Sequence, residues 1–231
     1  MQNINLSIVI VIFGIFLYLS ITAIAFGTSS TLSLAISDNS TLNEAINLTN
    51  KGISLNQIGK FNESIAFFNK ALDVDPKYVP ALTEKANALG GLGNYTQAIV
   101  YYDKVLDIDP KNVPALDNKG LSLYHLGNYT QAIVYYDKAL SLDPKHVLAL
   151  IGKGYALDNL GNHTGAKAYY NKALNIDPRY IPALTEKANF LIKLGNYQLA
   201  LIYYDKALAI DPNNAEAISG KKQVLDAMNQ P

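Results

Sequence analysis

The chain has 231 residues, of which 49% are apolar, so it has ample material for a buried core. Lys plus Arg equals Asp plus Glu at 19 each, so no net charge draws the chain to nucleic acid or to an anionic lipid surface. Cysteine is absent, which excludes disulfide scaffolds, thiolate zinc sites and cysteine nucleophiles.

The first element is an apolar leader. Residues 4–26 are almost wholly apolar and contain Ala23-Ile24-Ala25, a small-x-small pattern that a signal peptidase accepts. We therefore expect residues 1–26 to be a signal peptide cleaved after Ala25. The stretch is also about 20 residues long, enough for one membrane helix, so an uncleaved N-terminal anchor through residues 4–26 is the alternative. The first basic residue is Lys51, so flanking charge does not decide between them.

A polar segment follows the leader. Residues 27–44 are rich in Ser, Thr and Asn and contain no aromatic side chain. This composition is typical of a tether rather than of a core. Helical turns near residues 42–46 could extend from it into the next unit.

The rest of the chain is periodic. Asp-Pro pairs recur every 34 residues, at positions 75–76, 109–110, 143–144, 177–178 and 211–212. A period of this length predicts a repeat array. The expected units are 45–78, 79–112, 113–146, 147–180 and 181–214, followed by a capping helix over residues 215–231.

Each unit is predicted to contain two amphipathic helices. In the second unit, Leu82 and Ala86 follow helical spacing, and after Gly93 so do Ala98 and Tyr102. Gly93 suits the left-handed residue that ends a helix, and the Asp-Pro pair ends the second helix. The sequence therefore predicts an all-α chain of helical hairpins.

This pattern resembles the tetratricopeptide repeat family. The family's large, small, Ala, aromatic, Ala and Pro positions are matched by Leu82, Ala86, Ala98, Tyr102, Val105 and Pro110, and again by Leu116, Gly120, Ala132, Tyr136, Ala139 and Pro144. The resemblance implies a right-handed α-α superhelix that binds proteins or peptides on the concave surface formed by the first helix of each unit.

Two features depart from the family pattern. Lysine replaces the usual leucine once in every unit, at Lys51, Lys85, Lys119, Lys153 and Lys187. We expect each lysine stem to cover apolar surface while its amine reaches water. Lys222 replaces a small residue in the last half unit, which is consistent with a capping helix whose outer side is solvated.

The least repetitive positions expected in the groove are the candidate partner site. They are Asp117, Leu121, Tyr124, Ile151, Tyr155 and Asp158. An apolar, aromatic patch flanked by carboxylates could hold an extended or helical peptide. One subgroup of the family binds acidic peptide C-termini with two asparagines and three cations. In register with that clamp the chain has Asn87 and Asn118, but Thr83, Leu148 and Gly152 in place of the cations, so this binding is not expected.

Six Asn-x-Ser/Thr sequons could carry glycans on an exported protein: Asn39, Asn47, Asn62, Asn94, Asn128 and Asn162. The alternative interpretation is helix capping, since Thr96 and Asn62 are expected at the N-cap of a second helix.

No other motif predicts chemistry. His125, His146 and His163 fall at unrelated repeat positions and are expected on the solvated surface, and no metal-ligand spacing, nucleophile elbow or phosphate loop is present. Aromatic residues recur along the second helices at Phe67, Tyr101, Tyr135, Tyr169 and Tyr203, a ladder that could mediate lateral association.

The sequence thus favours a non-catalytic interaction scaffold, exported and either secreted or anchored with its repeats outside the cytoplasmic membrane. The alternative is a structural or self-assembling envelope component.

Overall fold

The structure is a computed structural model that describes residues 40–229. Its secondary structure within that range is entirely helical. The first helix covers residues 40–57, so residues 40–44, within the segment expected to be a tether, are helical. The others are α2 (Phe61–Val74), α3 (Val79–Gly91), α4 (Tyr95–Ile108), α5 (Val113–His125), α6 (Tyr129–Leu142), α7 (Val147–Asn159), α8 (His163–Ile176), α9 (Ile181–Lys193), α10 (Tyr197–Ile210) and α11 (Ala215–Met228).

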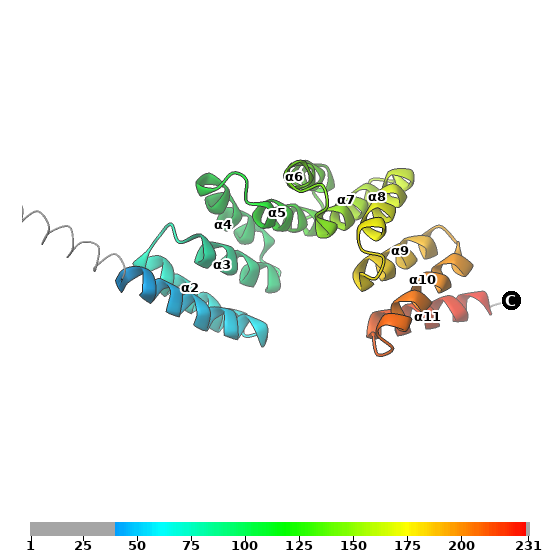
Figure 1. Cartoon of the computed structure of the whole chain (residues 1–231), viewed down its shortest axis with the longest axis horizontal. Coiled ribbons are helices and arrows are strands. Elements are labelled where there is room, and N and C mark those ends of the chain that lie inside the picture. The colour runs from blue at the N-terminus through cyan, green and yellow to red at the C-terminus, as the bar shows by residue number, and fades with distance from the viewer. Residues whose placement is uncertain (1–39, 230–231) are drawn as a thin grey trace, which may run out of the picture.

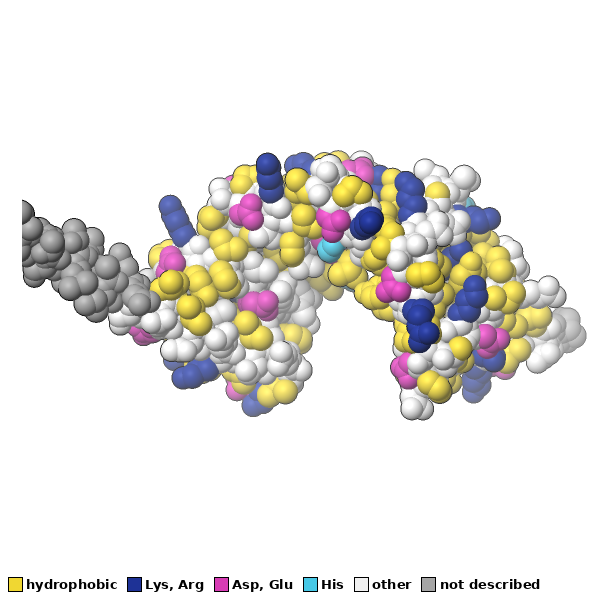
Figure 2. Space-filling model, in the orientation of Figure 1, with side chains coloured by type: hydrophobic (Ala, Val, Ile, Leu, Met, Phe, Trp, Pro, Cys, Tyr) yellow, Lys and Arg dark blue, Asp and Glu magenta, His cyan; other side chains and the backbone are white. Residues whose placement is uncertain are grey.

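The helices stack as hairpins into an arch (Figure 1). Each labelled helix packs against the next one along the chain, and the first helices of neighbouring units, α3, α5, α7 and α9, also contact one another in sequence. These first helices form the inner layer, and α6 lies on the outer side at the top of the arch. Figure 2 shows the hollow that opens beneath the centre of the molecule.

The predicted leader, residues 1–26, lies outside the described residues, as does most of the predicted tether. None of the helices within residues 40–229 is both long and apolar enough to cross a membrane.

The turn inside each unit depends on a left-handed glycine. Gly93 has φ +76°, and the four equivalent glycines have φ between +71° and +80°. This conformation lets the amide of Asn94 donate to the carbonyl of Leu89 at 2.9 Å, so the chain reverses directly after α3. A side chain with a Cβ atom would be strained there.

The helix caps differ from the prediction. The N-cap of α4 is Asn94, whose side-chain oxygen accepts from the amide of Gln97 at 3.3 Å, and Thr96 lies inside the helix. In the first unit the N-cap is Lys60, and Asn62 lies within α2. The prediction was wrong by two residues because the left-handed glycine directly precedes the N-cap.

Small residues allow close packing between helices. Ala98 and Val105 are fully buried against α3 and α5. Gly120 on α5 lies against Tyr136 of α6, and a Cβ atom at Gly120 would lie 2.8 Å from the ring carbon Cε1 of Tyr136. The predicted small positions therefore exist because an aromatic ring from the second helix occupies their space.

Three of the five repeated lysines, Lys119, Lys153 and Lys187, are buried rather than solvated. Lys119 is only 7% exposed, and its amine donates to the carboxylate of Asp103 and, at 2.7 Å, to the hydroxyl of Tyr135. Lys153 binds Asp137 of the preceding unit in the same way. The expectation that these amines reach water was wrong for Lys119 and Lys153, which bind a carboxylate on the preceding second helix, and for Lys187, which donates to the amide oxygen of Asn171.

Candidate functional site

A cavity of about 210 Å³ opens on the inner layer between α5, α7 and α9. Four of the six predicted site residues line it: Asp117, Leu121, Ile151 and Tyr155. The other lining residues are Asn118, Tyr136, Leu148, Gly152, Pro182 and Glu186. The repeat register brings residues from three units to one place, so the cavity is a composite of the third, fourth and fifth units.

The walls of this central pocket are mainly apolar. Leu121 is 42% exposed and Leu148 is 50% exposed, although both are large aliphatic side chains. Ile151 and Tyr155 add further apolar lining from α7, which also carries Leu148. Exposed apolar walls in a concave site provide binding free energy to an apolar group that displaces water from them.

Tyr124 lies beside the pocket rather than in its lining. Its ring centroid is 5.7 Å from that of Tyr155 and 5.3 Å from that of Tyr129. Its hydroxyl accepts a hydrogen bond from the side-chain amide of Asn159 at 3.1 Å, and burial raises its pKa. Tyr124 therefore supports Tyr155 and extends the aromatic surface beyond the pocket.

Asp158, the sixth predicted residue, does not line the pocket. Its side chain is 4% exposed, and its two oxygens bind Nδ1 of His163 and Nζ of Lys193, each at 2.8 Å. Lys193 comes from α9, 35 residues further along the chain. Contrary to the prediction, Asp158 is occupied in joining two units and does not flank an open patch.

The polar part of the pocket is acidic. Asp117 lies with Oδ2 3.3 Å from Nε2 of His146, and burial raises the pKa of this carboxyl while the charge of His146 lowers it. Burial also raises the pKa of Glu186 to about 7, with a further increase from Glu216 and a decrease from the hydrogen bond with Asn189. No Lys, Arg or His lines the pocket among the described residues.

His146 is thus not a solvated surface residue, because its ring packs beside Asp117 with the side chain 22% exposed. His125 stacks on Tyr95 with ring centroids 4.5 Å apart, and His163 binds Asp158. Within residues 40–229, no group of three or more His, Cys, Asp or Glu side chains is placed to hold a metal ion.

The hydroxyl of Tyr136 beside the pocket is buried and has no hydrogen-bond partner. In the second unit the equivalent Tyr102 donates to Asn87 at 2.7 Å, and in the fifth unit Tyr204 donates to Asn189 at 2.5 Å. Leu121 occupies that asparagine position in the third unit. The leucine widens the apolar wall and leaves the hydroxyl of Tyr136 unsatisfied.

Sequence reasoning missed Tyr136, Leu148 and Glu186 as parts of this pocket. For Tyr136 the sequence does contain a signal. The asparagine found in the second and fifth units is replaced by Leu121 and Tyr155 in the two central units. A residue that departs from the repeat pattern beside a buried tyrosine indicates that the packing around that tyrosine differs from the other units.

The sequons differ in their surroundings. The asparagines at 47, 62, 94, 128 and 162 are exposed, and Asn39 lies outside the described residues. The hydroxyl-bearing members of two sequons, Thr49 and Ser64, are buried. The other three described sequons begin at the N-caps of α4, α6 and α8 and have both polar members exposed.

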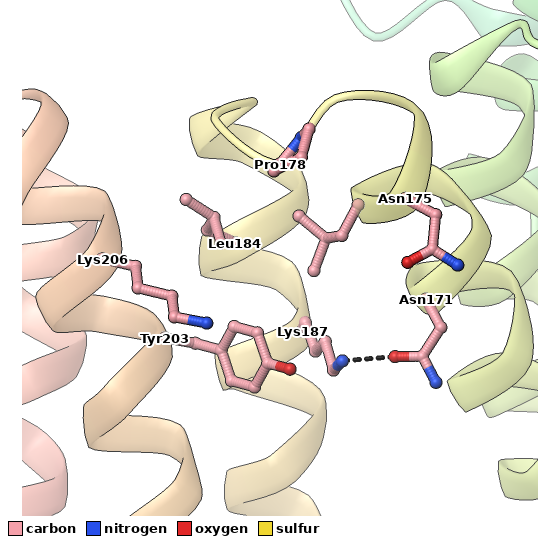
Figure 3. A pocket seen from close by; sticks show the side chains of 8 residues that line it. Asn171, Asn175, Pro178, Leu184, Lys187, Tyr203 and Lys206 are labelled. Carbon is pink, nitrogen blue, oxygen red and sulfur yellow. Dashed lines mark hydrogen bonds between the residues drawn. The ribbon is translucent and has the colours of Figure 1, made fainter.

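The aromatic ladder lies along the outer helices, where each of its four tyrosine rings is flanked by two lysines. Lys85 and Lys104 lie 4.1 and 4.7 Å from the ring centroid of Tyr101. Two clefts open at this ladder, one of about 420 Å³ beside Tyr101 and one of about 390 Å³ beside Tyr203, which Figure 3 shows.

Helical hairpins stacked with a 34-residue period around a concave surface define a helical repeat solenoid. The chain belongs to the tetratricopeptide repeat family: models of this repeat match residues 45–78, 79–112, 115–146, 148–180 and 181–214, which are the five predicted units to within two residues. No curated protein sequence matches it.

Solved structures of the same family share the fold. A thermophilic tetratricopeptide repeat protein of Thermus thermophilus, TTC0263, has TM-score 0.72 and 20% identity, covering 78% of this chain and 98% of its own. A tetratricopeptide repeat protein of Parabacteroides merdae has TM-score 0.72 and 24% identity over 80% of this chain and 72% of its own. YrrB, described as having an unusual peptide-binding site, has TM-score 0.56 and 25% identity over 82% of this chain and 97% of its own.

Proposed function

We propose that the protein is a non-catalytic scaffold that binds a peptide segment of a partner protein in the central pocket. The favoured peptide places an apolar side chain between Leu121 and Tyr155 and a basic residue near Asp117 and Glu186. The apolar walls and the acidic lining of the pocket support this pairing of groups.

One observation carries the proposal. Leu121 replaces the asparagine that would satisfy the buried hydroxyl of Tyr136, although the second and fifth units retain that asparagine. A buried hydroxyl without a partner costs about 1–3 kcal/mol. Local rules of packing are broken in this way mainly at functional sites, where the altered residue serves binding rather than stability.

The test uses the chain's own repeats as its control. In the double variant Leu121→Asn, Tyr155→Asn, both central units regain the residue found in the second and fifth units, so the fold is retained. A random peptide library is selected on the full wild-type chain, and the selected peptides are measured on both proteins by fluorescence polarisation. We expect peptides with an apolar residue next to Lys or Arg to bind the double variant at least about tenfold more weakly. Equal affinity for the two proteins would show that the peptides do not bind in the central pocket.

A structural or self-assembling role is the competing proposal. The tyrosine ladder that would join copies has its hydroxyls and rings engaged by lysines of the same chain, as at Tyr135 with Lys119 and Lys138. Light scattering over a wide concentration range separates the two functions, since self-assembly requires the particle mass to rise with concentration.

We also propose that the repeats are exported and held outside the cytoplasmic membrane, released or tethered through residues 4–26. The apolar leader with Ala23-Ile24-Ala25 supports this location, and the exposed sequons are compatible with it. Cell fractionation with N-terminal sequencing tests it, because a cleaved chain would begin at Phe26 and a cytoplasmic chain would retain its leader in the soluble fraction.

A further inference from the structure

Two clefts on the outer face lie at equivalent positions of the repeat, and they differ in charge. Each cleft lies between consecutive second helices and contains two lysines beside a tyrosine. The cleft at α8, α9 and α10 is lined by Asn171, Asn175, Lys187, Tyr203 and Lys206, together with three apolar residues (Figure 3). We call it the α8–α10 cleft.

Carboxylates bind three lysines equivalent to Lys187, namely Lys119, Lys153 and Lys221. Lys85 lies beside Asn69 and pairs with no carboxylate within 4.0 Å among the described residues. Asp103 and Asp137 occupy the place of Asn171 in the two preceding units, where they bind Lys119 and Lys153. The place of Asn175 is taken by Asp73 in the cleft beside Tyr101. In the α8–α10 cleft both positions, 171 and 175, are asparagine, whereas each other described unit has an aspartate in at least one of the two equivalent positions.

Both lysines of the α8–α10 cleft lack a counterion among residues 40–229. The amine of Lys187 donates to the neutral amide oxygen of Asn171, and that side chain is otherwise buried. The amines of Lys187 and Lys206 lie 4.3 and 5.1 Å from the ring centroid of Tyr203, and neither lies within 4.0 Å of a carboxylate oxygen. Two ammonium groups therefore face one open cleft of about 390 Å³ without a negative charge.

We propose that the α8–α10 cleft binds a carboxylate from an acidic segment of a partner polypeptide. The carboxylate supplies between Lys187 and Lys206 the charge that Asp137 supplies to Lys153 in the preceding unit. The side-chain amides of Asn171 and Asn175 add hydrogen-bond donors for the second oxygen. This site lies on the opposite face from the central pocket and does not depend on the function proposed for that pocket.

An exchange of asparagine and aspartate between neighbouring clefts tests the proposal. Asn171→Asp gives the α8–α10 cleft an internal carboxylate, and Asp137→Asn removes the carboxylate that binds Lys153 at the equivalent place of the preceding unit. Both changes reproduce residues that the chain already uses in that position, so the fold is retained, which thermal unfolding checks. The probe is a fluorescein-labelled peptide of alternating Glu and Ala, and the matched control is the same peptide with Gln.

We expect the full wild-type chain to bind the Glu peptide and not the Gln peptide, and binding to weaken as salt is raised. Asn171→Asp should weaken this binding by about tenfold, the effect of one lost charge-assisted contact. Asp137→Asn should add a second equivalent of bound peptide. Equal binding by wild type and Asn171→Asp, or equal binding of the two peptides, overturns the proposal. Displacement of the Glu peptide by inorganic phosphate at equal concentration also overturns it, because the cleft would then be a site for small anions.

Discussion

Lys119 on α5 and Asp103 on α4 are sixteen residues apart in the chain and form an ion pair across the boundary between two units. The lysine side chain is almost buried, whereas the carboxylate is about half exposed. The same pair recurs at Lys153 with Asp137, and at Lys221 with Asp205 at 2.6 Å. The lysine that departs from the family pattern is therefore a connection between units.

The first prediction concerns the cost of breaking this pair. Asp103→Ala leaves the buried amine of Lys119 with only the hydroxyl of Tyr135, and we expect it to lower the free energy of unfolding by about 1–2 kcal/mol. Lys119→Met keeps the apolar stem and removes the buried charge, so it should stay within about 1 kcal/mol of wild type. Urea unfolding measures both, and a neutral Asp103→Ala would show that the pair contributes nothing.

The second prediction compares two glycines in first helices. A Cβ atom at Gly152 would lie 2.5–2.7 Å from three atoms of Tyr136, whereas a Cβ atom at Gly90 would meet nothing within 4 Å. Gly152→Ala should therefore lower the free energy of unfolding by about 1–3 kcal/mol, because the ring must move. Gly90→Ala should raise it by up to about 1 kcal/mol through helix propensity. Thermal unfolding of the two variants should move in opposite directions, and a shift in the same direction would contradict the packing.

The third prediction is a pH dependence that Glu186 produces. Burial raises the pKa of its carboxyl from 4.5 to about 7 in the folded state, so the folded chain binds this proton more tightly than the unfolded chain does. The contribution of this group to stability is present below pH 4.5 and is lost as the pH rises toward 7. With allowance for its partial exposure the loss is about 1–2 kcal/mol.

Glu186→Gln provides the comparison, since it keeps the shape of the side chain and removes its titration. The variant should be more stable than wild type at about pH 8 and similar at about pH 4.5. Urea midpoints measured across this range are the test, and parallel curves for the two proteins would rule out Glu186 as the source.

The fourth prediction isolates the hydroxyl of Tyr136. Leu121→Asn alone supplies the acceptor that Asn87 and Asn189 supply to their tyrosines. Because Leu121 is already 42% exposed, little apolar contact is lost, and we expect the free energy of unfolding to rise by about 1 kcal/mol. The measurement is again the urea midpoint, and a destabilised variant would mean that Leu121 is retained for packing.

The repeat register could be predicted from the sequence because each boundary carries a residue with one local role. Gly93 and its equivalents adopt the left-handed conformation, and the helix pairs follow the predicted unit boundaries. These features depend on residues near one another in the chain. The same register placed Asp117, Leu121, Ile151 and Tyr155 around one pocket.

Features that depend on distant partners were not predictable in this way. Asp158 was expected to be free in the groove, but Lys193 lies 35 residues away and reaches it only because the units stack. The burial of Lys119 likewise depends on Asp103 in the previous unit. A side chain's charge and spacing do not show whether a neighbouring unit already neutralises it.

The contacts between first helices have a consequence for how such a chain can change its length. Each labelled helix contacts only helices of its own unit and of the adjacent ones. A unit duplicated or deleted before α5 would therefore meet the same kind of junction as before, and the central pocket formed by α5, α6, α7 and α9 would keep its walls. The number of repeat units and the residues that line the pocket can thus evolve separately.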